Sequence, residues 1–168
     1  MSSLMAARAA GARRTIAIDI AESKFTLARD LGVHEIYNAA DRDCVNKVRP
    51  STNGGVHIAR ETAGVTKAFG TASRITRRGG FTVTAGLPGP DAKITLRRQE
   101  CATEERQLKG SYMVSCVPIR DIPRYMGLFK DGRLPANSLM SSSITLYELN
   151  EGFDRLADVS KIREVVIL

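Results

Sequence analysis

The 168-residue sequence predicts an α/β fold, with a doubly wound, mostly parallel sheet and helices on both of its faces. Short β-rich apolar runs alternate with segments in which apolar residues recur at helical spacing. This alternation is typical of strand–helix–strand units, whose right-handed crossovers place helices on both sides of a parallel sheet. The length suits one domain, or one domain with an appendage.

The N-terminal part of the chain predicts two helix–strand pairs. Residues 2–10 are small, apolar and compatible with a helix that Gly11 ends, and 14–19 form a short apolar run that is typical of a buried strand. Apolar residues near helical spacing predict a helix over 23–31, and 34–38 predict a short strand.

The middle of the chain continues the pattern. Asp41 is suited to cap a helix that runs toward Arg49 and stops at Pro50. A strand over 56–61 follows, and then a helix over 65–75 with Ala68, Phe69 and Ala72 on one face.

The remaining segments begin at residues 77–80, whose Arg-Arg-Gly-Gly sequence predicts a turn. We expect strands over 81–85, 107–114 and 164–168, and helices over 118–130 and 146–156.

Parallel sheets of this kind bind ligands at the carboxyl ends of their strands. The sequence therefore offers four strand ends as candidate ligand-binding positions, namely Asp19, Glu61 to Gly64, Ala85 to Pro88, and Ser111 to Met113.

The net charge of +7 raises the question of nucleic acid. The basic residues are scattered, apart from pairs and the short cluster from Arg74 to Arg78, and no aromatic residues are interleaved for base stacking. We therefore favour solvated surface charge and expect no nucleic-acid partner. We also expect no membrane association, because no apolar run approaches the length of a bilayer span.

The cysteines and histidines are too widely separated to predict a zinc site within this chain. Cys44, Cys101 and Cys116 form no Cys-x-x-Cys pair, and His34 and His57 are far from any paired ligand. The simplest interpretation of each cysteine is a small buried hydrophobe. An odd count without a disulfide framework suits a reducing, cytoplasmic location.

Asp19 at the end of a strand has two interpretations that the local pattern leaves equally open. It is either a turn or capping acid, or the acid that binds the adenosine ribose in a dinucleotide-binding fold and favours NAD over NADP. In that fold the acid follows a glycine-rich turn by roughly 20 residues, which would put the glycines at Met1 or just before it. This offset favours the interior of a fold over a cleavable leader for the first residues.

Five stretches follow one another along the chain: LMAARAAGARRTIAIDIAESKFTLARDLG, RRGGFTVTAGLP, ERQLKGSYM, LNEGFDRL and KIREVVIL. Together they resemble the nucleotide-binding domain of zinc-dependent, medium-chain alcohol dehydrogenases, and the resemblance runs in order from Met1 to Leu168. The resemblance implies an incomplete Rossmann-type sheet that lacks its first strand and glycine-rich turn, and NAD as cofactor. Departures from the family pattern are His57, Arg60 and residues 141–143, the last of which we expect to form a loop.

The resemblance also implies residue roles. Asp19 and Lys24 match contacts to the adenosine ribose, and Arg163, which the sequence alone would treat as a surface charge, matches a residue that neutralises the pyrophosphate. Three further positions match backbone groups that hold the nicotinamide carboxamide: Ala85, Ser111 and Met113.

On this resemblance, 1–114 form the dinucleotide-binding domain, and 115–168 pack in the family against a catalytic domain that holds the zinc. The implied reaction is hydride transfer between a small alcohol or aldehyde and NAD. We expect no catalytic residue and no metal ligand in this chain, and no turnover by the chain alone.

The first strand that the resemblance implies to be missing is the central one in a doubly wound sheet. Loss of its ladder bonds on both sides would cost about 10 kcal/mol, whereas the whole free energy of unfolding of a domain is about 5–15 kcal/mol. We therefore also expect low stability. Two other hypotheses are a non-catalytic paralogue that forms oligomers through the strand near 107–114, and, less favoured, a basic nucleic-acid binder.

Overall fold

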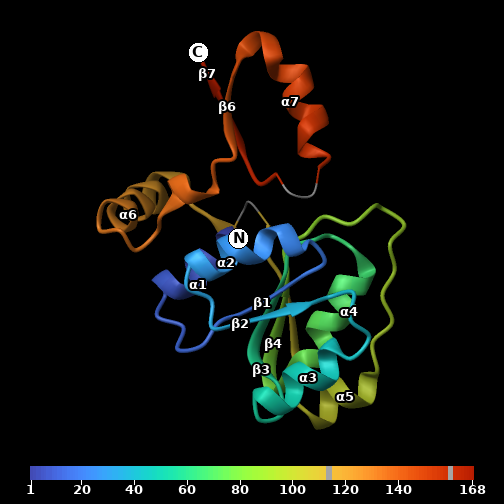
Figure 1. Ribbon diagram of the computed structural model, residues 1–168. Coiled ribbons are helices and arrows are strands. Elements are labelled where there is room, and N and C mark those ends of the chain that lie inside the picture. The colour runs from blue at the N-terminus through green and yellow to red at the C-terminus, as the bar shows by residue number, and fades with distance from the viewer. Residues whose placement is uncertain (113–114, 159–160) are drawn as a thin grey trace. The chain divides into compact units, whose positions relative to one another are not determined.

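The computed structural model describes residues 1–112, 115–158 and 161–168, and it shows an α/β protein in which every strand pair is parallel (Figure 1). The helices are α1 (Ser2–Ala9), α2 (Phe25–Asp30), α3 (Cys44–Ser51), α4 (Thr66–Ile75), α5 (Arg98–Thr103), α6 (Pro118–Lys130) and α7 (Leu149–Leu156). Single 3₁₀ turns are η1 (Glu22–Lys24), η3 (Ala136–Leu139) and η4 (Leu146–Glu148). The strands are β1 (Ile16–Asp19), β2 (Glu35–Asn38), β3 (Val56–Glu61), β4 (Thr76–Thr84), β5 (Gln107–Gly110), β6 (Ser142–Thr145) and β7 (Glu164–Ile167). The predicted fold class is confirmed.

The chain divides into two compact units. Unit 1 contains Met1–Asn38 and Pro118–Leu168, and unit 2 contains Ala39–Val117. This structural division differs from the division at 114/115, which rests on the family resemblance and stays a prediction.

Unit 2 is built on one sheet with the strand order β3-β4-β5. Helix α4 packs on β3 and β4, because Phe69, Ala72 and Ile75 recur on one side of it and are at most 7% exposed. On the sheet side, Ala59 and Thr82 are each 5% exposed. This core holds the carboxyl ends of the three strands in register.

Residues 77–80 were predicted to be a turn between helix and strand, and this was wrong. They lie inside β4, which pairs with β3 at both Val56↔Thr76 and Ile58↔Phe81, so that the extra residues form a bulge. Gly79 has φ +66°, a conformation that costs glycine little. The double glycine therefore interrupts the ladder without ending the strand.

Other boundaries also differ from the predictions. The helix predicted to be capped by Asp41 begins at Cys44, because the Asp41 carboxylate accepts from the Asp43 N–H and from Lys47 instead. Pro50 lies within its last turn rather than beyond its end.

Towards the C-terminus, β5 ends at Gly110 rather than at 114, and residues 113–114 lie outside the described part of the chain. The loop expected at 141–143 is wrong, because β6 begins at Ser142 and pairs with β7. Helix α5 was not predicted at all.

Unit 1 contains two small sheets, β1-β2 and β6-β7. Its core cluster joins α1, the end of α2 and η3 through Met5, Leu31 and Leu139, which are 4%, 8% and 2% exposed. The guanidinium of Arg133 donates to the Ala9 carbonyl and adds a polar tie. Helix α7 packs on the β6-β7 pair.

Of the described strands only β4 pairs on both sides; β1 pairs with β2 alone, and β3 with β4 alone. Of the helices within the described residues, none combines the length and apolarity needed to cross a bilayer.

Candidate functional site

Asp19 lies at the carboxyl end of β1, where the sequence placed it. Its Oδ1 accepts a hydrogen bond of 3.0 Å from the Ala21 N–H, and its Oδ2 lies 4.0 Å from the Nζ of Lys24. The structure therefore brings Asp19 and Lys24 together. One oxygen therefore stabilises the turn, as the first interpretation of Asp19 predicts, and the other lies beside the ammonium group. The contact to an adenosine ribose stays a prediction.

The neighbouring strand end contributes a polar side chain to the same place. Asn38 pairs in register with Asp19, and its side-chain amide donates to Oε1 of Glu22 at 2.8 Å. The turn after β1 is therefore tied to the end of β2 by side chains as well as by the ladder.

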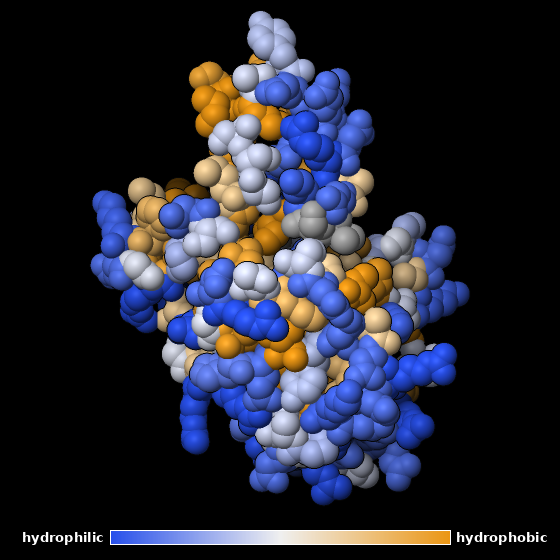
Figure 2. Space-filling model, viewed as in Figure 1, coloured by the Kyte–Doolittle hydropathy of each residue, from blue (hydrophilic) through white to orange (hydrophobic). Residues whose placement is uncertain are grey.

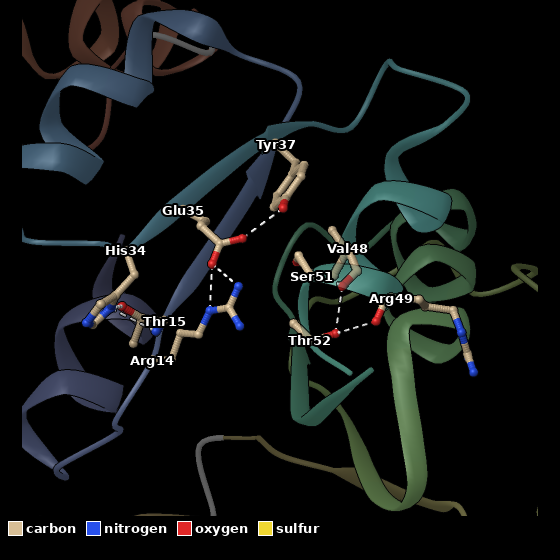
Figure 3. A network of polar contacts seen from close by, with 9 residues as sticks. All are labelled: Arg14, Thr15, His34, Glu35, Tyr37, Val48, Arg49, Ser51 and Thr52. Atoms are coloured by element: carbon tan, nitrogen blue, oxygen red, sulfur yellow. Dashed lines mark hydrogen bonds and ion pairs between the residues drawn. The ribbon is translucent and has the colours of Figure 1, made fainter. Parts of the chain in front are cut away.

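A second polar network fixes the start of β1 against β2 (Figure 3). The guanidinium of Arg14 forms an ion pair with Glu35, and the Tyr37 hydroxyl donates to the other Glu35 oxygen at 2.8 Å. The backbone N–H of Thr15 donates to Nδ1 of His34 at 3.0 Å, which makes that nitrogen an acceptor. His34 thus ties the residue that precedes β1 to the start of β2.

In unit 2, Ala85 and Ser111 follow the carboxyl ends of the adjacent strands β4 and β5. Thr84 pairs with Gly110 in register, so the two residues that come next lie at the same end of the sheet. The Ala85 N–H donates to the Glu61 carbonyl and the Ser111 N–H donates to the Thr84 carbonyl, both at 2.9 Å. Their positions are therefore set by the backbone.

Glu61 organises this end of the sheet, a role that the sequence did not predict. Its side chain accepts from the backbone N–H groups of Ala63 and Gly64 and, at 3.0 Å, from the Thr84 hydroxyl. The residue is only 5% exposed, and three donors satisfy its carboxylate in the interior. The available signal was a lone acid at the end of an apolar strand.

Two glycines let the loops at this end touch. A Cβ on Gly86 would overlap the backbone of Gly64, and Gly64 itself has φ +71° with its Cβ position directed at the Leu87 carbonyl. Only glycine permits this approach of 61–64 to 85–87.

The roles of two predicted site residues, Met113 and Arg163, stay predictions. Met113 lies outside the described residues. Arg163 precedes β7 in unit 1 and is exposed, and its backbone accepts a 2.7 Å hydrogen bond from the Ser141 N–H. Nothing in these contacts tests the role predicted for its guanidinium.

The described residues do not fit a zinc site. They contain no group of three or more His, Cys, Asp or Glu side chains placed to hold a metal ion. Cys44 is buried, and burial raises the pKa of its thiol, which disfavours the thiolate that zinc needs. The burial expected of every cysteine is wrong for Cys101, which is exposed, and Cys116 is half-buried.

The model of the family described as zinc-binding dehydrogenases matches residues 1–131. The chain belongs to the zinc-binding dehydrogenase family. The resemblance to the zinc-dependent alcohol dehydrogenases is thereby confirmed.

Named relatives of this zinc-binding dehydrogenase chain include plant and bacterial enzymes. It is 31% identical to alcohol dehydrogenase 1 of Trifolium repens over 163 residues, which covers 95% of this chain and 43% of the relative. It is 29% identical to the geraniol dehydrogenase of Castellaniella defragrans over 171 residues, or 99% of this chain and 45% of that enzyme. The chain therefore spans less than half the length of these relatives.

Solved structures agree on the fold. An alcohol dehydrogenase zinc-binding domain protein from Burkholderia ambifaria superposes with a TM-score of 0.93 at 26% identity, over 99% of this chain and 45% of that one. Benzyl alcohol dehydrogenase from Acinetobacter calcoaceticus gives a TM-score of 0.92 over 98% of this chain and 45% of its own, at 24% identity. The Rossmann-type architecture that the sequence predicted is thus confirmed.

Proposed function

We propose that this chain is the NAD-binding portion of a zinc-dependent alcohol dehydrogenase. The observation that carries the proposal is the Asp19 carboxylate at the carboxyl end of a parallel strand, with Lys24 beside it. A carboxylate there accepts hydrogen bonds from ribose hydroxyls and repels a 2′-phosphate. NAD is therefore the cofactor we expect, rather than NADP.

Each group of residues has its own part in holding the cofactor. Asp19 Oδ2 and Lys24 bind the adenosine ribose. The backbone at Ala85, Ser111 and Met113 receives the nicotinamide carboxamide, and the exposed Arg163 neutralises the pyrophosphate. Because the N–H groups of Ala85 and Ser111 donate within the sheet, their carbonyl oxygens are the groups that accept from a carboxamide NH₂.

The residues present fit NAD at the ribose, where a partly exposed carboxylate with remaining acceptor capacity is available. When bound, NAD accepts the hydride, and the chain's own residues orient it. The sequence holds no Gly-x-Gly-x-x-Gly turn for the phosphates, and the described residues do not fit zinc. We therefore expect weak NAD binding and no alcohol turnover by residues 1–168 alone.

The substrate class of the whole enzyme is a small alcohol or aldehyde, a proposal supported by the names of the relatives. We place the protein in the cytoplasm, in keeping with cysteines that form no disulfide bond within the described residues.

Residues 115–168 are the part that we expect to contact the catalytic half of such an enzyme. In α6, Ile119, Ile122, Met126 and Phe129 are between 47% and 91% exposed, although their spacing is that of a buried face. Apolar side chains at this density are typical of an interface.

Calorimetric titration of residues 1–168 with NAD and NADP tests the cofactor proposal. We expect Asp19→Asn to weaken NAD binding about tenfold and to reduce the preference over NADP, because a neutral amide no longer repels the 2′-phosphate. Asp30→Asn, which changes an exposed acid at the end of α2, is the matched control. Equal NAD affinity in the wild type and in Asp19→Asn would contradict the assignment.

A second candidate function is oligomerisation through β5. This strand is at the edge of its sheet, and all four of its residues are exposed. The Ser111 N–H points to β4, so by alternation the N–H of Leu108 points away from the sheet and is available to a second copy.

Leu108→Pro removes that outward donor without breaking the ladder to β4. We expect it to shift a dimer to monomer in analytical ultracentrifugation, while Leu108→Ala, which keeps the N–H, leaves the dimer largely intact. A wild-type chain that stays monomeric at high concentration would exclude this function.

A further inference from the structure

Unit 2 carries most of the net positive charge of the molecule. Residues 39–117 contain 13 Lys and Arg against 7 Asp and Glu, whereas the rest of the chain contains 12 and 11. Hydrophilic residues cover the face over α3 and α5 in the lower part of the space-filling view (Figure 2). The charge is thus concentrated in one unit.

The structure gathers basic residues that are scattered in the sequence. The Arg49 guanidinium of α3 donates to the Arg74 carbonyl of α4 at 2.8 Å, and Nη1 of Arg77 lies 3.1 Å from Nε2 of His57 on β3. The Nε of Arg74 donates to the Gly70 carbonyl at 3.2 Å, and Arg78 is exposed next to Arg77 on β4. Arg49, His57, Arg74, Arg77 and Arg78 thus form a basic cluster around the amino end of the sheet. Ala85 and Ser111 lie at the opposite, carboxyl end of the same sheet, so the basic cluster is distinct from them.

The acids near this cluster compensate it only in part. The Gly79 N–H donates to the Glu104 carbonyl, which brings Glu104 and Glu105 alongside. The Glu104 carboxylate is ion-paired with Arg106, and its side chain is 21% exposed. Glu105 is the exposed acid next to it.

We propose that this basic cluster docks on the phosphate backbone of double-stranded nucleic acid. This proposal replaces the expectation of no nucleic-acid partner, which rested on scattered charge and missing base-stacking residues. Guanidinium groups bind phosphate oxygens in bidentate fashion, and contacts to the backbone need charge but no base-stacking residue. In the described part of unit 2, Phe69 is buried, Phe81 is half-buried and Tyr112 lies beyond the opposite end of the sheet, so the cluster lacks the aromatic anchors that dominate protein–protein interfaces. Binding is therefore independent of sequence and sensitive to salt.

The test is fluorescence anisotropy of a labelled 20-base-pair DNA duplex titrated with residues 1–168 over a series of salt concentrations. We expect binding at low salt, and the variant Arg74→Gln/Arg78→Gln to weaken it about tenfold or more and to reduce the slope of log K against log salt by about 2. Arg13→Gln/Arg29→Gln, which removes two exposed charges from unit 1, is the matched control and should lose far less. Glu105→Gln should tighten binding.

Three results would overturn the proposal. They are no binding of the duplex at low salt, equal losses in the two double variants, and displacement of the duplex by polyglutamate as effective as by unlabelled DNA, which would indicate an acidic protein surface instead. Thermal melts of the two double variants are the control for folding. Melting temperatures close to that of the wild type show that a loss of binding is not a loss of fold.

Discussion

The two units bury their apolar residues to different extents. Unit 2 encloses Phe69, Ala72 and Ile75 of α4 between helix and sheet, and it is the more basic of the two units. Unit 1 leaves Ile119 of α6, Tyr147 of η4 and Phe153 of α7 at 91%, 100% and 64% exposure. Apolar surface at α6 and beside β6 is visible in Figure 2. The comparison teaches that unit 2 buries a whole helix face against its sheet, whereas unit 1, beside its small core of Met5, Leu31 and Leu139, presents apolar surfaces that we expect another part of an enzyme to cover.

The largest expected effect is on the free energy of unfolding, and a matched pair of substitutions, one in each unit, tests it. Phe69→Ala should lower the free energy of unfolding by about 3–5 kcal/mol, because it opens a cavity in a buried core. Phe129→Ala in α6 should change it by about 0.5 kcal/mol or less, because that ring is already 47% exposed. Urea denaturation followed by circular dichroism measures both, and equal effects would remove the distinction between the units.

A smaller effect is expected at the carboxyl end of the sheet in unit 2. Glu61→Ala leaves two backbone N–H groups and the Thr84 hydroxyl without their acceptor, which should cost about 2–3 kcal/mol. Arg60→Ala, at the exposed neighbouring position, should change stability by less than about 0.5 kcal/mol. If Glu61→Ala melts like the wild type, the carboxylate does not hold these loops.

The smallest effect concerns pH in unit 1. Hydrogen bonds from Arg155 hold the pKa of Glu164 below its usual value, and Ser142 contributes to the same shift. A lowered folded-state pKa adds stability above the unfolded value of about 4.3. That stability is lost as the pH falls through the folded value.

Thermal melts between pH 7 and pH 3 check this expectation. The melting temperature should fall less steeply with pH in Glu164→Gln than in the wild type, since the amide does not titrate. Glu151→Gln, whose side chain is 77% exposed and 3.8 Å from Arg155, should follow the wild type. Parallel curves for all three proteins would show that the Arg155–Glu164 pair does not couple to folding.

Most elements could be predicted from the sequence because their signals are local. The spacing of Phe69 and Ala72 indicated both α4 and its buried face, and the apolar run before Asp19 indicated β1. The errors arose where long-range contacts decide. Residues 77–80 look like a turn in isolation, but pairing with β3 on either side of them keeps them inside a strand.

The candidate site was predicted in part for the same reason. Asp19 and Lys24 are five positions apart, so a short turn is enough to bring them together. The role of Glu61 depends on Thr84, a residue of another strand 23 positions away, and the sequence gives no indication of that contact.

By itself the sequence determined the alternation of helices and strands, the family and the acid at the end of β1, since periodicity, turn residues and motif spacing are properties of neighbouring residues. Only the tertiary structure decided which apolar faces are buried and where charge accumulates. The apolar side chains of α6 have the spacing of a buried helix face and yet are exposed, because burial requires a partner surface. Arg49 and His57 join the cluster from Arg74 to Arg78 only because α3, α4 and the sheet pack together.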